Sequence, residues 1–366
     1  DTGRLGLIVP SGLYTDAGTR DLRTLFLEQG TWEWLFSFEN RRKIFDIDSR
    51  FKFAPTIVDR RRTGAPMQAA FMVHDVAAWE RPDPPVFPFD TSLIPLFSPR
   101  SKSLPEVRTR RDLDICRKIY EHSIRIGDNA PGWEITYAQE FNMTSDSRLF
   151  PPREKWEAKG YKPDVFGRWI GPEGDVALPL YQGTMLGQLN FSEQGFASGS
   201  GRSNHWEIIP CDRSIVLPKY MIGASAAPSK SKMSCAKLAF RDITNATNER
   251  TFIGAVLCGL PCGNTAPVLV PKQRPLRRAL LFSAALCTLT SDYAARMRIG
   301  GTHLNFFIAQ DMPVPFGNIP QGAEVCLVRI AACLNFIHRR FAPEWLRLRA
   351  LYPELGKREW KYWWAV

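Results

Sequence analysis

The sequence predicts an α/β region, then a largely β region of mixed α+β character, and a helical C-terminal segment. Residues 4–10, RLGLIVP, form a nearly continuous apolar run, which is typical of a strand covered on both faces in a parallel sheet. Short strand patterns broken by frequent turns occupy residues 133–270. Apolar residues at helical spacing dominate after residue 275.

The first strand is followed by a helix and two more strands. Thr15 or Asp16 can cap the helix, and Gly30 suits its C-terminal end. Residues 31–38, TWEWLFSF, are rich in aromatic strand formers, and residues 50–58, RFKFAPTIV, are the next strand candidate. The order strand, helix, strand, loop, strand predicts that the last two strands are antiparallel partners.

The later elements follow from composition and periodicity. Residues 60–104 contain many prolines and predict an extended connector. Residues 106–123 place apolar side chains at helical spacing between basic ones, which predicts an amphipathic helix. Residues 276–299, 323–340 and 343–351 predict three further helices.

The charge and composition indicate a partner class and a compartment. A formal net charge of +11 and a pI near 9.4 favour an anionic partner, most often nucleic acid. The chain has no run of about 18 apolar residues and no signal-type start, so we expect a cytoplasmic protein without membrane contact. The eight cysteines include no CxxC pair, which favours reduced thiols over disulfides or a zinc site.

No catalytic motif stands out in the sequence. A nucleophile elbow, a Walker loop and a metalloprotease helix are all missing. Residues 196–201, FASGSG, echo a glycine-rich cofactor turn, but polar residues flank them where such a turn needs a buried strand and a helix. A mobile Gly/Ser loop is the preferred interpretation. The sequence therefore predicts no catalytic residue and no metal site in this chain.

Five blocks resemble the C-terminal half of bacterial adenine-N6 DNA methyltransferases, namely the type IIG restriction-modification enzymes and related phage-defence methylases. The blocks match from about residue 3 to residue 315 in the family's order, and they read GRLGLIVPSGLYTDAGTRDLRTLFLE, FENRRKIFDIDSRFKFAPTIV, LPLYQGTMLGQLN, FRDITNATNERTFIGAVL and RIGGTHLNFFIAQDMPVP.

The resemblance implies a domain order. It places the last strands of a Rossmann-like methyltransferase sheet in residues 1–63, a proline-rich connector with an amphipathic helix in 64–132, a target recognition domain in 133–320 and a helical segment in 321–366. The family's turn for S-adenosyl-L-methionine and its Asn-Pro-Pro-aromatic tetrapeptide would precede Asp1, and neither occurs here.

The resemblance also implies a function. We expect the chain to recognise double-stranded DNA and to position a target adenine for an upstream catalytic part or a separate methyltransferase subunit. S-adenosyl-L-methionine is then expected only in the complete enzyme, and this chain should be inactive alone. A non-enzymatic DNA specificity subunit and a basic scaffold protein without DNA binding are the two alternatives.

Phe45 matches a position of the family, and other residues are candidates for DNA contact because of their charge or their hydrogen-bonding groups. Phe45 matches an aromatic residue that stacks on the flipped target base, although Asp46 stands where the family has proline; packing within the hairpin is the alternative. Arg41, Arg42 and Lys43 are candidates for phosphate contacts, and a solvated face is the alternative for this run of charges. Further DNA-binding candidates, which a structural ion network or an anchoring role would explain as well, are Arg202, Asn204, His205, Arg241, Asn248, Arg250, Arg298 and His303.

Overall fold

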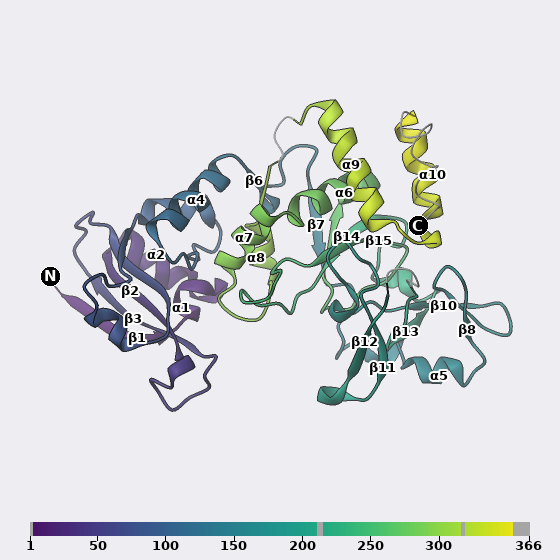
Figure 1. Ribbon diagram of the computed structural model, residues 1–366, viewed down its shortest axis with the longest axis horizontal. Helices are drawn as coiled ribbons and strands as arrows, with labels where there is room; N and C mark the ends of the chain where they lie inside the picture. Colours follow the sequence, from purple (N-terminus) through teal and green to yellow (C-terminus); the bar gives the residue numbers. More distant parts are fainter. Residues whose placement is uncertain (1–2, 211–214, 316–318, 354–366) are drawn as a thin grey trace. The chain divides into compact units, whose positions relative to one another are not determined.

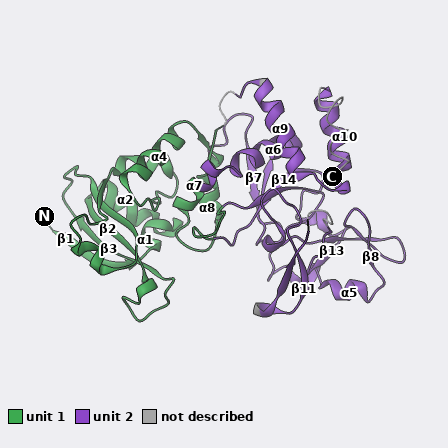
Figure 2. Ribbon diagram, viewed as in Figure 1, with its two compact units in different colours: residues 1–127, 245–251, 293–315 green, residues 128–244, 252–292, 316–366 purple. Residues whose placement is uncertain are grey.

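The computed structural model describes residues 3–210, 215–315 and 319–353, and it has a mixed α/β architecture with several sheets (Figure 1). The chain divides into two compact units (Figure 2). Unit 1 comprises Asp1–Gly127, Asn245–Thr251 and Tyr293–Pro315, and unit 2 comprises Asp128–Thr244, Phe252–Asp292 and Phe316–Val366. The N-terminal strands and most of the proline-rich segment that follows them belong to unit 1.

Unit 1 contains a five-stranded sheet with the order β1-β3-β2-β4-β5. Its strands are β1 (Arg4–Pro10), β2 (Thr31–Glu39), β3 (Lys52–Asp59), β4 (Met67–Val73) and β5 (Phe87–Phe89). β3 lies between β1 and β2 and is antiparallel to both, so the predicted antiparallel pair is confirmed. β2 and β4 are parallel, which shows that the predicted connector contains a strand of this sheet.

The strand β1 is confirmed, but its predicted surroundings are not. Its partner β3 is antiparallel, and β1 pairs with no second strand in the part of the chain that the structure describes. Leu5, Leu7 and Ile8 are also exposed, with 62% of Ile8 accessible, so neither face of β1 is covered at these positions. An apolar run alone does not reveal whether a strand is central or at an edge.

Helices cover one face of this sheet, where the main core of unit 1 lies. They are α1 (Gly12–Thr15), α2 (Arg20–Glu28), α3 (Ile94–Phe97) and α4 (Arg110–Glu121). Phe26 of α2 packs edge-on against Trp32, with 5.5 Å between ring centroids. The predicted amphipathic helix is confirmed as α4, which begins with a capping box between Thr109 and Asp112. α2 begins later than predicted, because α1 and a 3-10 turn occupy the residues before it.

Unit 2 combines helices with short strands, and the strands lie within the region for which the sequence predicts them. One sheet has the order β15-β14-β16-β7, another has the order β13-β10-β9-β8, and β11 pairs with β12 in a two-stranded ribbon. The strands are β7 (Ile135–Ala138), β8 (Lys162–Pro163), β9 (Trp169–Ile170), β10 (Val176–Pro179), β11 (Gln194–Ser198), β12 (His205–Ile208), β13 (Met221–Gly223), β14 (Ala236–Phe240), β15 (Gly254–Cys258) and β16 (Val268–Pro271). In unit 1, β6 (Ile124–Arg125) pairs with β17 (Pro313–Val314).

The remaining helices correct one sequence-based prediction. They are α5 (Arg153–Glu157), α6 (Pro275–Leu286), α7 (Leu289–Arg298), α8 (Phe306–Gln310), α9 (Gln321–Asn335) and α10 (Ala342–Leu351). The single helix expected over 276–299 is broken at Thr288, whose hydroxyl donates to Ala285 O at 2.7 Å and accepts the Ser291 N–H at 3.2 Å. None of the helices among the described residues has both the length and the apolar character needed to span a membrane.

A buried ion pair fixes the β14 sheet from within. Lys237 of β14 is 0% exposed, and its ammonium donates to Glu140 Oε1 at 2.6 Å and to Ser231 Oγ at 3.0 Å. The Cys262 N–H donates to the same carboxylate at 2.9 Å. Such a pair depends on both charges, since either one alone would be buried without compensation.

We predict that Lys237→Met lowers the free energy of unfolding by about 3–5 kcal/mol, because it leaves Glu140 buried without its cation. The matched control is Lys230→Met, which breaks the pair with Asp146 in which the lysine side chain is 45% exposed, and it should cost less, because solvent screens this pair. Urea denaturation measures both values. Equal losses for the two variants would contradict the role of the buried pair.

Candidate nucleic-acid interface

Residues 40–51 form the loop that joins β2 to β3. The register pairs Glu39 with Lys52, and the Asn40 N–H donates to Phe51 O at 2.9 Å, which closes the loop at its base. Because β1 and β2 are both antiparallel to β3, the loop leaves the sheet at the carboxyl ends of β1 and β2. Open α/β sheets commonly bind their ligands at this edge.

The buried side chain of Asn40 organises the loop tip. Its amide nitrogen donates to Phe45 O at 2.9 Å and to Ile47 O at 3.1 Å, and its Oδ1 accepts the Phe45 N–H at 3.0 Å. Asn40 has no accessible surface. One amide therefore satisfies three backbone groups that have no strand partner. Sequence reasoning missed this residue, because an asparagine beside a basic run is common in solvated loops.

Phe45 lies at the tip with part of its ring exposed. It is 41% accessible, and its ring meets Phe53 edge-on with 4.8 Å between centroids. Phe53 stacks in turn on Phe38, and Phe38 stacks on Trp79 at 5.0 Å. The ring thus has an aromatic support on one side and solvent on another.

The three consecutive cations of the loop, Arg41, Arg42 and Lys43, are exposed. Arg41 Nε lies 2.9 Å from Glu39 Oε2, and Arg42 forms an ion pair with Asp75. Lys43 adopts a left-handed backbone conformation with φ of 54° at the turn. Each arginine is anchored by one carboxylate and still presents half or more of its side chain to solvent, as phosphate contacts require.

Asp48 stabilises the far side of the loop. Arg50 donates to it from its backbone N–H at 2.8 Å and from Nη2 at 2.9 Å. These hydrogen bonds hold the pKa of the Asp48 carboxyl well below its usual range. The carboxylate therefore stays ionised at neutral pH, which is unsuited to general acid chemistry.

A buried polar network supports the base of the loop. Lys52 Nζ donates to Glu106 Oε2 at 2.6 Å, the Tyr14 hydroxyl donates to Glu106 Oε1 at 2.7 Å, and the same hydroxyl lies 2.6 Å from Ser37 Oγ. Burial and the Glu106 carboxylate raise the pKa of Tyr14 well above its ordinary value. No sequence signal links Tyr14 to Glu106, because they are 92 positions apart.

The ribbon β11–β12 holds the second group of candidates. Asn204 is half-buried and its Oδ1 accepts a hydrogen bond from Lys219 Nζ at 2.6 Å. His205 is exposed, with Nδ1 3.8 Å from Glu207 Oε1. Arg202 belongs to the turn, but its side chain lies outside the described residues. The structure thus places Asn204 and His205 next to each other on one ribbon.

The glycine-rich stretch 199–201 joins the two antiparallel strands of this ribbon. Gly199 has φ of +94°, and a Cβ there would lie 2.1 Å from Ser203 O, so only glycine fits the turn. A turn between two strands lacks the helix N-terminus that a cofactor phosphate or carboxylate would meet. This stretch therefore does not fit S-adenosyl-L-methionine.

The other candidates are dispersed. Arg241 lies in unit 2 and donates from Nε to Leu186 O at 2.7 Å, and burial lowers its pKa. Asn248, which is exposed, and Arg250, which is half-buried, belong to the segment Asn245–Thr251 of unit 1. The block FRDITNATNERT is thus shared between the two units.

Arg298 has an internal position that differs from the expected DNA contact. It is 4% exposed, and its Nη2 lies 2.7 Å from Asp311 Oδ2 and 3.1 Å from Ser103 Oγ. Its guanidinium therefore links α7 to the segment after α8, which agrees with the alternative anchoring role. His303, by contrast, is exposed.

No family model matches the chain, and no curated protein matches it. Among solved structures, the chain is similar to the type IIG restriction endonuclease BpuSI, with a TM-score of 0.37 and 11% sequence identity. The match covers 90% of this chain and 42% of that one, so the chain spans less than half the length of the solved structure. Among the described residues, no group of three or more His, Cys, Asp and Glu side chains could hold a metal ion.

We predict that Asn40→Ala accelerates tryptic cleavage after Arg41, Arg42 and Arg50 by roughly tenfold, because the loop loses the amide that holds its tip. Timed digestion with mass analysis of the fragments measures the rates. The control is Asn142→Ala, which removes similar side-chain bonds from a loop of unit 2 and should leave these cleavages unchanged. An unchanged cleavage rate in Asn40→Ala would show that the amide does not order the tip.

Proposed function

We propose that this chain recognises double-stranded DNA and positions the target adenine for an adenine-N6 DNA methyltransferase of restriction-modification or phage defence. The observation that carries this proposal is the half-exposed ring of Phe45, held at a hairpin tip by the buried Asn40 and flanked by exposed cations. Methyl transfer and S-adenosyl-L-methionine belong, in this proposal, to an upstream catalytic part or to a separate subunit.

Phe45 is suited to stack on a base that has left the duplex. An enzyme that modifies a base must rotate it out of the helix, and an aromatic face compensates for the stacking that the base loses. The edge-on contact with Phe53 supports the Phe45 ring, and the backbone on both sides of the ring is fixed by Asn40. A fixed ring loses little conformational entropy when the base arrives.

In this proposal the cations of the hairpin loop contact DNA phosphates, and the ribbon β11–β12 contacts base edges. Arg41, Arg42 and Lys43 beside the tip suit the phosphates near the flipped base. The major groove admits a two-stranded ribbon, and Asn204 and His205 of β11–β12 offer hydrogen-bonding groups for base edges. Phosphate contacts then fix the position of the chain on the duplex, and the ribbon reads its sequence.

The outer edge of β1 suits a partner strand. This seven-residue apolar strand pairs on one side within the described residues, and Leu5, Leu7 and Ile8 are exposed. Edges of this kind accept a further strand from another segment or chain. We assign this edge to the catalytic part of the methyltransferase. If that part is a separate chain, the protein is a non-enzymatic specificity subunit.

We predict that Phe45→Ala, in the methyltransferase that contains this chain, reduces base flipping by roughly tenfold while duplex affinity changes little, because stacking matters only once the base is out. Fluorescence of 2-aminopurine at the target position reports flipping, and a filter-binding titration reports affinity. The matched control is Phe51→Ala, which removes an exposed ring from the same loop and should leave flipping intact. Unchanged flipping in Phe45→Ala refutes the stacking role.

We predict that the double variant Arg41→Glu, Arg42→Glu weakens duplex binding by a similar factor at every sequence, and lowers the salt slope of binding by about two, because phosphates carry no sequence information. Fluorescence anisotropy with cognate and unrelated duplexes measures both effects. The control is Arg347→Glu with Arg349→Glu, an equal charge change on exposed positions of α10. A loss confined to the cognate duplex would contradict phosphate contacts.

A further inference from the structure

Residues 162–170 of unit 2 form a second hairpin, and its tip is apolar and exposed. Strands β8 and β9 pair antiparallel, and the Asp164 N–H donates to Arg168 O at 2.7 Å, which closes the turn. At the tip, Val165 is 61% exposed and Phe166 is 42% exposed. Turns normally hold polar residues, so two consecutive apolar side chains at this position indicate a contact surface.

One carboxylate fixes the shape of this tip. Asp164 Oδ1 accepts the N–H groups of Phe166 at 2.9 Å and of Arg168 at 2.8 Å, and its Oδ2 accepts from Arg168 Nε at 2.7 Å. Burial opposes ionisation of this group, but the hydrogen bonds outweigh it and lower the pKa of the Asp164 carboxyl. Gly167 has φ of +75°, a conformation that favours glycine, and its N–H donates to Asp164 O at 3.1 Å. The tip therefore holds its shape through its own residues.

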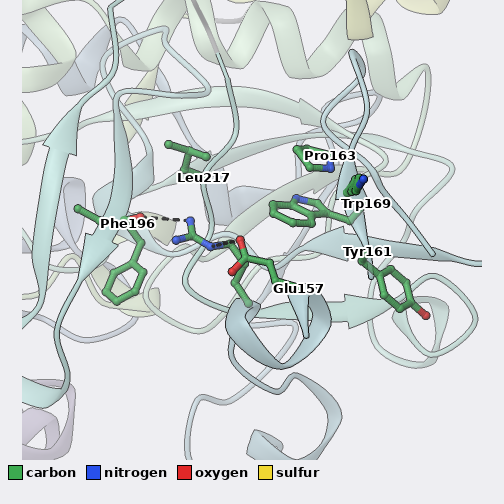
Figure 3. Close-up of a pocket in the computed structure, with 9 residues that line it drawn as sticks. Glu157, Tyr161, Pro163, Trp169, Phe196 and Leu217 are labelled. Atoms are coloured by element: carbon green, nitrogen blue, oxygen red, sulfur yellow. Dashed lines mark hydrogen bonds and ion pairs between the residues drawn. The ribbon is translucent and has the colours of Figure 1, made fainter. Parts of the chain in front are cut away.

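The hairpin is also anchored below its tip. Trp169 of β9 is 3% exposed and packs in a small hydrophobic cluster of unit 2. Figure 3 shows it beside Pro163, its partner on β8, at the base of the hairpin. Arg340 Nη1 donates to Phe166 O at 3.3 Å, and its Nη2 donates to Cys258 O at 3.2 Å. An exposed tip that is already ordered loses little conformational entropy when a partner binds.

Positive charge exceeds negative charge beside the tip. The Arg168 guanidinium carbon lies 5.4 Å from the centroid of the Phe166 ring, and 49% of the Arg168 side chain is exposed. Lys162 is exposed at the start of β8, and Asp164 is the one carboxylate in the sequence of residues 162–170. An apolar tip with cations beside it matches DNA, in which phosphates flank the stacked bases.

We propose that Val165 and Phe166 form a wedge that enters the minor groove of a DNA duplex and partly separates two stacked base pairs. This inference rests on the proposed DNA recognition. Proteins that bind the minor groove insert apolar side chains between base steps, and the duplex kinks by roughly 20–90°. Contacts of Lys162 and Arg168 with the adjacent phosphates offset the cost of unstacking. The wedge favours pyrimidine–purine steps, because these unstack most easily.

Energy transfer between fluorophores at the two ends of a short duplex tests the wedge, because a kink brings the ends closer together. The full chain at saturating concentration should increase the transfer. Phe166→Ala should remove most of this increase and weaken duplex binding by roughly tenfold, whereas Phe166→Leu should retain the kink, since leucine also serves as a wedge. The matched control is Phe306→Ala, which removes an exposed ring from unit 1 and should change neither value.

Lys162→Glu separates the wedge from the phosphate contacts. This variant should weaken duplex binding and lower its salt slope by about one, yet the kink at saturation should remain. If the bound duplex is not kinked, or if Phe166→Ala retains the kink, the wedge is overturned. The proposed function then stands, because base flipping at Phe45 does not depend on the wedge.

Phe45→Ala distinguishes the wedge from the proposed function, and it should leave the kink in place. A kink that disappears in Phe45→Ala but survives Phe166→Ala belongs to the hairpin of residues 40–51 and overturns the wedge. A duplex that is kinked through Phe166, but whose target base does not flip, supports the wedge and contradicts the proposed adenine positioning. If the chain binds no duplex, both proposals are overturned.

Discussion

The amide of Asn40 is the contact on which the hairpin tip depends. β3 inserts between β1 and β2, and this arrangement fixes where the chain must turn. The turn is long, and its backbone groups have no neighbouring strand, so one buried side chain replaces a strand edge for Phe45 and Ile47. Below it, Glu106 holds Lys52 at the start of β3. The position of the Phe45 ring follows from these two internal supports.

The count of 48 lysine and arginine residues overstates the cations that are available to a partner. Lys237 and Arg298 are buried against Glu140 and Asp311, and Arg23, also buried, donates to backbone oxygens such as Leu13 O. These cations hold segments together that are distant in sequence. Arg41 and Arg42 of the hairpin loop are different. Each pairs with one carboxylate, and half or more of each side chain remains accessible to solvent.

The hairpin and the amphipathic helix α4 were predictable, because both follow from local apolar spacing and from turn or capping residues. Three features could not be predicted from the sequence: the edge position of β1, the assignment of residues 245–251 to unit 1, and the break between α6 and α7 at Thr288. Each depends on a partner far along the chain or on one hydroxyl. The local sequence does not distinguish Arg42 from Arg298. In the structure Arg42 pairs with Asp75 and is exposed, whereas Arg298 pairs with Asp311 and is buried.

Binding of this chain to a DNA duplex across a range of salt concentrations tests the proposed recognition most directly. Three phosphate contacts by Arg41, Arg42 and Lys43 predict that the logarithm of the binding constant falls linearly with the logarithm of salt concentration, with a slope of about −3 or steeper if the ribbon contributes. Binding that is insensitive to salt, or no binding to the duplex at low salt, would contradict DNA recognition by this chain.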